Sequence, residues 1–146
     1  MKKLAMILLS LILLVGCSNS KELSKEDYSF KASNISTYFF MVETKISDAI
    51  YNLKMKNETN YKKAIDNAKN EYEKLNSKIK ELGNAPDELK SLSELIEDTD
   101  KSIHKLIDLT ENENSSITEI EKEKENYTKL YDELKNEAKF YYDKYK

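Results

Sequence analysis

The chain has 146 residues, is 35% charged and carries a net charge of −3, yet it contains no arginine and no tryptophan. Arginine is the side chain best suited to bind phosphates and guanine edges, so we expect no nucleic-acid partner. Two glycines and one proline provide few turn-forming residues, which argues against a β-sandwich or barrel and favours one helical domain.

The first residues have the pattern of an export signal. Lys2 and Lys3 precede an apolar stretch of about 12 residues at positions 4–15, a length that suits a signal peptide and is too short to span a bilayer. The sequence LVGC follows at positions 14–17, and Cys17 is the only cysteine. A single thiol leaves no disulfide, so the stability of the domain must come from packing.

The LVGC sequence resembles the lipobox of bacterial lipoproteins. In that family a diacylglycerol is attached to the cysteine sulfur, and the signal peptide is cut just before that residue. The resemblance implies cleavage between Gly16 and Cys17, a lipid anchor on Cys17, and a location on the extracytoplasmic face of the cell membrane. We therefore expect a signal peptide at residues 1–16, a lipidated cysteine with a polar tether at 17–24, and a helical domain at 25–146.

From residue 25 onward, apolar residues recur every three or four positions, as they do on one face of an α-helix. We expect four helices with apolar faces made, in chain order, by Ala32, Ile35, Phe39, Val42, Ile46, Ala49 and Leu53; by Tyr61, Ile65, Ala68, Tyr72, Leu75, Ile79 and Leu82; by Leu89, Leu92, Ile96, Ile103 and Leu106; and by Ile117, Ile120, Tyr127, Tyr131, Leu134, Ala138, Tyr141 and Tyr145. Short connections between such helices favour an all-α, antiparallel four-helix bundle.

The sequence marks the connections between these helices unequally. Gly83 suits a left-handed position just after a helix, and Pro86 suits the first turn of the next one. Ser116 and Glu119 have the spacing of a capping box. Residues 54–60 contain neither glycine nor proline, so a turn there competes with a continuous helix. The continuous helix would give a three-helix arrangement or an elongated coiled coil.

No motif in the chain carries recognisable catalytic or metal chemistry. His104 is the only histidine, and it shares a helix face with Asp100 and Asp108. A ferritin-like site needs two Glu-x-x-His repeats, and a zinc cluster needs thiols that this chain lacks. No nucleophile elbow or glycine-rich phosphate loop is present. We expect no enzyme activity, no metal and no cofactor, and we expect solvent-exposed pairing of His104 with its neighbouring carboxylates.

Aromatic residues gather near the start and the end of the helical part. Phe40, Phe140 and Tyr142 lie off the apolar faces, whereas wide helix faces would bury most of the other rings. In an up-down-up-down bundle, the first helix starts where the last one ends, next to the tether. We therefore expect these three residues to contact the membrane, where aromatic side chains are favoured, and residues 54–60 and 110–116 to form a polar distal end.

The whole layout resembles the small, lysine-rich helical lipoproteins of low-GC Gram-positive bacteria, some of which are described as cell-wall-binding proteins. The resemblance implies a membrane-anchored, non-catalytic protein-interaction module of the cell envelope with an envelope protein as partner. A mobile-element protein that excludes a second phage or plasmid would be one example. Two alternatives remain: a peptidoglycan-associated wall binder or structural spacer, and self-association, because Thr99 and Lys124 interrupt the apolar faces.

Overall fold

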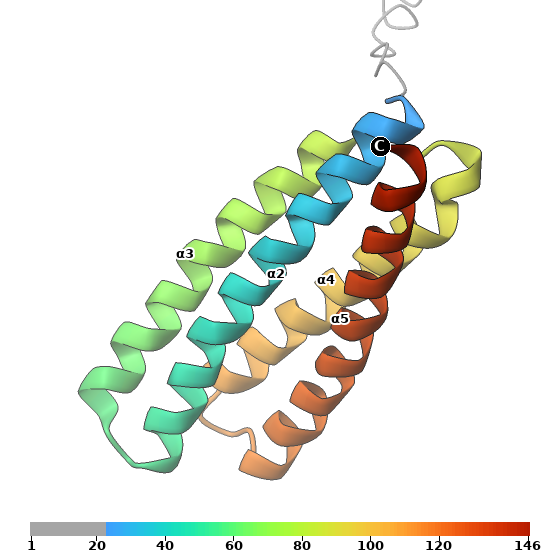
Figure 1. The fold of residues 1–146 in the computed structure, drawn as a ribbon. Helices are drawn as coiled ribbons and strands as arrows, with labels where there is room; N and C mark the ends of the chain where they lie inside the picture. The colour runs from blue at the N-terminus through green and yellow to red at the C-terminus, as the bar shows by residue number, and fades with distance from the viewer. Residues whose placement is uncertain (1–22) are drawn as a thin grey trace, which may run out of the picture.

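The computed structural model describes residues 23–146, and within them four α-helices run alternately in opposite directions (Figure 1). They are α2 (Lys25–Lys54), α3 (Glu58–Leu82), α4 (Lys90–Glu111) and α5 (Ile117–Tyr145), and a short 3₁₀ helix, η1 (Asp87–Leu89), precedes α4. The predicted all-α, antiparallel four-helix bundle is confirmed. The predicted signal peptide, with Gly16 and Cys17, lies outside the described residues.

A tight turn separates α2 from α3. The backbone N–H of Asn57 donates to the carbonyl oxygen of Asn52 at 2.9 Å, and Lys56 adopts a positive φ of 55°. The side chain of Asn57 then accepts a hydrogen bond from the backbone N–H of Asn60 at 3.2 Å and caps the start of α3. The prediction of a turn within residues 54–60 is confirmed, and the continuous helix is wrong.

The other two connections follow the sequence signals closely. Gly83 has the predicted positive φ, but its ψ of −156° places it in a backbone region that glycine alone adopts readily. Pro86 directly precedes η1, so it starts the short 3₁₀ helix and not α4 itself. The capping box at the start of α5 is confirmed, because Ser116 and Glu119 each bond the other's backbone N–H.

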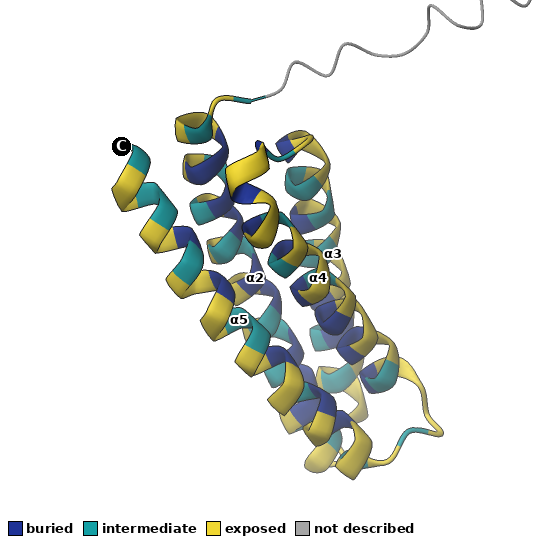
Figure 2. Cartoon of the chain, turned by 90° about the vertical axis from the view of Figure 1, so that its right-hand side faces the viewer, coloured by how far each residue is buried: buried dark blue, intermediate teal, exposed yellow. Residues whose placement is uncertain are grey.

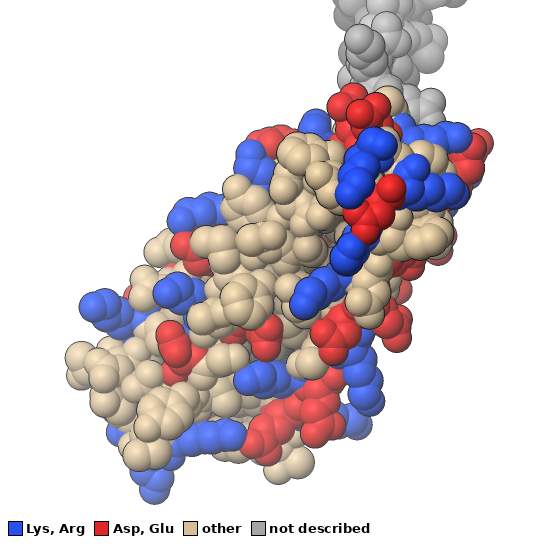
Figure 3. Space-filling model, in the orientation of Figure 1, with Lys and Arg blue, Asp and Glu red and all other residues tan. Residues whose placement is uncertain are grey.

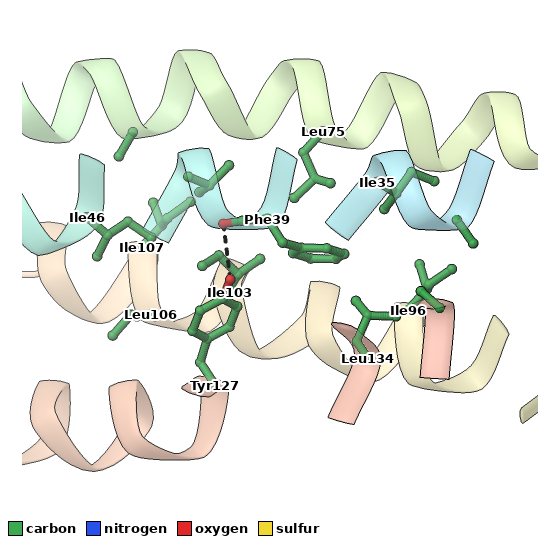
Figure 4. Close-up of a cluster of buried hydrophobic side chains, with 14 of the residues drawn as sticks. Ile35, Phe39, Ile46, Leu75, Ile96, Ile103, Leu106, Ile107, Tyr127 and Leu134 are labelled. Carbon is green, nitrogen blue, oxygen red and sulfur yellow. Dashed lines mark hydrogen bonds between the residues drawn. The ribbon is translucent and has the colours of Figure 1, made fainter. Parts of the chain in front are cut away.

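The hydrophobic core is arranged around α2, which packs against each of the other three helices. Buried residues follow its inner face along the whole helix (Figure 2). In the middle of the core, Phe39 lies between α3, which contributes Leu75, and α4, which contributes Ile103 (Figure 4). The hydroxyl of Tyr127, from α5, donates to the backbone carbonyl of Phe39 at 3.1 Å. One residue layer therefore joins all four helices.

The two polar residues that interrupt the predicted apolar faces have partners within the chain. The hydroxyl of Thr99 donates to the carbonyl of Leu95 at 2.7 Å. The ammonium group of Lys124 donates to the hydroxyl of Ser47 at 2.9 Å and so joins α5 to α2. Since both groups are satisfied inside one bundle, they give no reason to expect an oligomer.

A buried carboxylate between α4 and α5 was not anticipated from the sequence. One oxygen of Glu123 accepts hydrogen bonds from Ser102 at 2.6 Å and from Asn126 at 3.1 Å, and the other lies 2.6 Å from the ammonium of Lys105. Burial by itself raises the pKa of Glu123, but the hydrogen bonds from these three groups and the charge of Lys105 outweigh it and hold the pKa below its ordinary value.

We predict that Glu123→Gln lowers the free energy of unfolding at neutral pH by about 1–3 kcal/mol. Because the folded-state pKa is lowered, ionised Glu123 stabilises the fold above the unfolded-state pKa of about 4.3, and that contribution is lost as the pH falls through the folded-state value. Urea unfolding between neutral and acidic pH tests this, with the exposed Glu125→Gln as control. A stability profile parallel to that of the wild type would contradict the prediction.

We predict that Gly83→Ala lowers the free energy of unfolding by about 1–3 kcal/mol through backbone strain. No atom lies within 4 Å of the position that a Cβ would occupy, so crowding does not contribute. Lys56→Gly is the matched control, and it should raise stability by about 1 kcal/mol, because glycine removes the strain of a positive φ. Thermal unfolding measures both changes, and equal signs for the two variants would refute the argument.

Candidate functional site

The start of α2, the end of α5 and the α3–α4 connection lie at one end of the bundle (Figure 1). Residues 23 and 24 lead into α2 there, so the preceding part of the chain joins the bundle at this end, which we call the tether end. The α2–α3 turn and the α4–α5 connection form the opposite, distal end. The expectation that the first helix starts at the end of the bundle where the last helix ends is confirmed.

Aromatic rings from two helices gather at the tether end. Phe30 of α2 is 54% exposed and Phe140 of α5 is 59% exposed. Tyr142 is half-buried, with its ring centroid 6.2 Å from that of Phe30. The rings of Tyr141 and Tyr145, one turn apart on α5, stack with their centroids 6.1 Å apart. Rings that the sequence separates by more than 100 positions thus form one neighbouring group.

Lysine side chains lie over these rings. The ammonium of Lys144 is 4.9 Å from the ring centroid of Tyr145, and Lys25 approaches the same ring at 5.9 Å. Lys146 lies 5.5 Å from the ring centroid of Tyr142. At these distances a cation is attracted to the negative face of the ring. The tether-end surface, as we use the term, comprises Lys25, Phe30, Phe140, Tyr141, Tyr142, Lys144, Tyr145 and Lys146.

The charges at the tether end are balanced. Asp143 lies 2.5 Å from Lys139 and 3.0 Å from Lys146, and the hydrogen bond from Lys139 is the main reason that the pKa of Asp143 is lowered. Lys25 pairs with Glu88 of η1. Two further acidic residues occupy the first turn of α2, where the helix N-terminus stabilises negative charge. The exposed rings, and not an excess of charge, therefore distinguish this end.

Two of the three aromatic residues predicted to contact the membrane lie at the tether end, namely Phe140 and Tyr142. Phe40 does not. It lies ten residues beyond Phe30 on α2, about 15 Å further along the helix axis, with 54% of its surface exposed. Phe30 takes its place at the tether end. The sequence already indicated Phe30, since it is an aromatic residue near the start of the helix and off the predicted apolar face that begins at Ala32.

The distal end is less polar than expected. Tyr51 is 63% exposed and Met55 is 62% exposed, both near the end of α2. Lys54 and Lys56 lie beside them and are also exposed. The expectation of a polar distal end is therefore wrong at Met55, which lies within residues 54–60, and it did not include the neighbouring Tyr51.

His104 lies on the surface of α4 in a small cluster. Its ring stacks on that of Tyr72 with centroids 5.1 Å apart, and its Nε2 is 3.8 Å from a carboxylate oxygen of Asp108. Asp100 is half-buried and not solvent-exposed as expected, and burial raises the pKa of its carboxyl group. Across residues 23–146, no group of three or more His, Cys, Asp or Glu side chains is placed to hold a metal ion.

None of the helices in residues 23–146 has both the length and the apolar character to cross a membrane. No protein-family model, no curated protein and no solved structure matches the chain. The fold therefore defines residues 23–146 only as an all-α four-helix bundle. Any function has to be argued from its surfaces.

We predict that Phe140→Ser changes the free energy of unfolding by less than about 1 kcal/mol, because the ring is largely exposed. Phe39→Ser should instead cost at least about 3–5 kcal/mol, since it removes a fully buried ring from the core. Chemical unfolding of the two variants makes the comparison. A large loss for Phe140→Ser would assign the tether-end rings to the core.

Proposed function

We propose that the protein is a membrane-anchored extracytoplasmic lipoprotein that serves as a non-catalytic protein-interaction module of the cell envelope. The observation that carries the proposal is the position of the exposed rings. Phe30 and Phe140 lie at the same end of the bundle as the tether, which follows the lipobox-like sequence at residues 14–17. The expected anchor and the exposed aromatic surface would thus face the same bilayer.

The length of the tether supports a close approach to the membrane. Residues 18–24 span at most about 25 Å when fully extended. A diacylglycerol on Cys17 would supply two acyl chains, which is about what stable anchoring requires. The tether-end surface would therefore stay within reach of the headgroups.

The residue types of the tether-end surface suit that position. Tyrosine side chains are favoured where the bilayer meets water, and phenylalanine side chains can insert at the boundary between headgroups and acyl chains. Lysine stems can lie along apolar surface while the ammonium stays in water. Lys144 already lies over the ring of Tyr145 in this way. Because the charges at this end are balanced, we expect the rings to provide most of the binding and salt to weaken it little.

The body of the bundle would extend away from the anchor and meet the partner. The 30 residues of α2 correspond to about 45 Å of helix. The wall-binding alternative depends on exposed tyrosines, but of the ten tyrosines, all within residues 23–146, only Tyr51 is largely exposed and the other nine are buried or half-buried. A protein partner is therefore the better-supported reading.

We predict that Phe140→Ala weakens the binding of residues 23–146 to phosphatidylglycerol vesicles by about five-fold, close to 1 kcal/mol for a half-exposed ring. Phe40→Ala is the matched control, because Phe40 is similarly exposed but lies in the middle of α2. Vesicle flotation provides the measurement. Equal binding by the two variants would remove the tether-end surface from the proposal.

The anchor itself is tested separately in cells. Cys17→Ala should release the full-length protein from the membrane fraction, while the wild type stays with it. Membrane retention of this variant would overturn the lipoprotein assignment, whatever the vesicle experiment gives.

A further inference from the structure

The outer face of α2 differs from the outer faces of the other helices. Eight residues, spaced alternately by four and three positions, run along it, and all are exposed. This outer stripe comprises Phe30, Asn34, Thr37, Met41, Thr44, Asp48, Tyr51 and Met55. Asp48 is its only charged residue, whereas the exposed residues of α3, α4 and α5 are mostly lysine, glutamate and aspartate. Figure 3 shows the broad uncharged surface on the face that includes α2.

The spacing of the outer stripe is that of a helix-pairing surface. An alternation of four and three positions keeps side chains in register with a second helix, as in a coiled coil. The inner face of α2 already uses the same spacing to pack inside the bundle. A groove of about 500 Å³ between α2 and α3 adjoins the stripe and is lined by Asn34, Tyr38, Met41 and Lys78. A second helix lying on the stripe would border this groove.

The order of residue types along the stripe indicates which helix that is. From Phe30 to Tyr51 the stripe reads aromatic, Asn or Asp, Thr, Met, Thr, Asn or Asp, aromatic, and it reads the same in reverse. When the order of residue types along a helix is the same in both directions, two antiparallel copies related by a two-fold axis bring like residue types together. We propose that two copies of this chain pair through the outer stripes of α2, antiparallel, with the two-fold axis beside Met41.

The pairs that result are chemically matched. Phe30 lies opposite the partner's Tyr51, Thr37 lies opposite the partner's Thr44, and Met41 meets the partner's Met41. Asn34 lies opposite the partner's Asp48, where its amide can donate a hydrogen bond to the carboxylate.

Charge selects the antiparallel arrangement over the parallel one. In a parallel pair, each stripe residue meets its own counterpart, so Asp48 would lie against the partner's Asp48. Two like charges at one helix–helix contact destabilise the pairing. The antiparallel pair separates the two carboxylates and gives each an uncharged hydrogen-bond donor.

The antiparallel pair remains compatible with two anchors in one membrane. The two tethers leave from opposite ends, so a dimer held by both anchors lies with its long axis along the bilayer. A dimer held by one anchor extends away from the bilayer, as the proposed function describes for the single bundle. The radius of a helix with its side chains is about 5–6 Å, and a tether reaching about 25 Å passes easily from the bundle end to the surface beneath it. The pairing itself needs no lipid and can be tested without relying on the proposed function.

Sedimentation equilibrium of residues 23–146, which contain every helix and core residue described here, tests the pairing. The wild type should show a concentration-dependent dimer, and Met41→Glu should be monomeric because it places two charges at the two-fold axis. Phe140→Glu is the control and should still dimerise, since it changes a similarly exposed residue outside the stripe. A monomeric wild type at high micromolar concentration would overturn the proposal.

Cysteine crosslinking tests the direction of the pair and stays informative if Met41→Glu fails to fold. Residues 23–146 contain no cysteine, so each introduced thiol is unique. With a short thiol-specific crosslinker, Met41→Cys should crosslink to itself. Phe30→Cys and Tyr51→Cys should crosslink only when the two are mixed. Self-crosslinking of either one alone, or no crosslink in any combination, would refute antiparallel pairing.

Discussion

The packing of α2 against all three other helices is the constraint on which the rest of the structure depends. Its inner face carries small and large apolar residues without a charge, from Ala32 to Ala49, so α3, α4 and α5 can each approach it. The layer around Phe39 joins the four helices, and Tyr127 ties α5 to the backbone of α2 at the same level. Because the other three helices pack along α2, the helix termini and connections gather at two ends of the bundle, the tether end and the distal end.

The periodicity of the sequence predicted the four helices, because the spacing of apolar residues is local information. Three features depended on tertiary packing and could not be read in the same way. Lys56 takes a positive φ that its residue type does not favour. Glu123 lies in a run of charged residues typical of a solvent-exposed face, and only the packing of α5 against α4 buries it beside Ser102 and Lys105. Phe40 and Phe30 are both off the predicted apolar face, and only their place on the folded helix separates them: Phe30 lies at the tether end and in the outer stripe, and Phe40 lies in the middle of α2 beside that stripe.

The helix α2 thus has three structural roles. The inner face of α2 builds the core, its first turns contribute to the tether-end surface, and its outer face carries the proposed pairing stripe. Phe30 belongs to the last two surfaces, whereas Phe140 and Met41 each belong to one of them. Substitutions at Phe140 and Met41 can therefore separate membrane contact from pairing, and a substitution at Phe30 cannot.

The order of the helices also determines how the chain can fold. The bundle consists of two antiparallel helical hairpins. In one, α2 packs against α3, and in the other, α4 packs against α5; a connection of only a few residues joins the two helices of each hairpin. Contacts between sequence neighbours cost little loop entropy and are associated with rapid folding. As the chain is synthesised from its N-terminus, the α2–α3 hairpin is complete before α4 begins. The central helix is then already in place as a template, and no disulfide exchange can delay the arrival of the second hairpin.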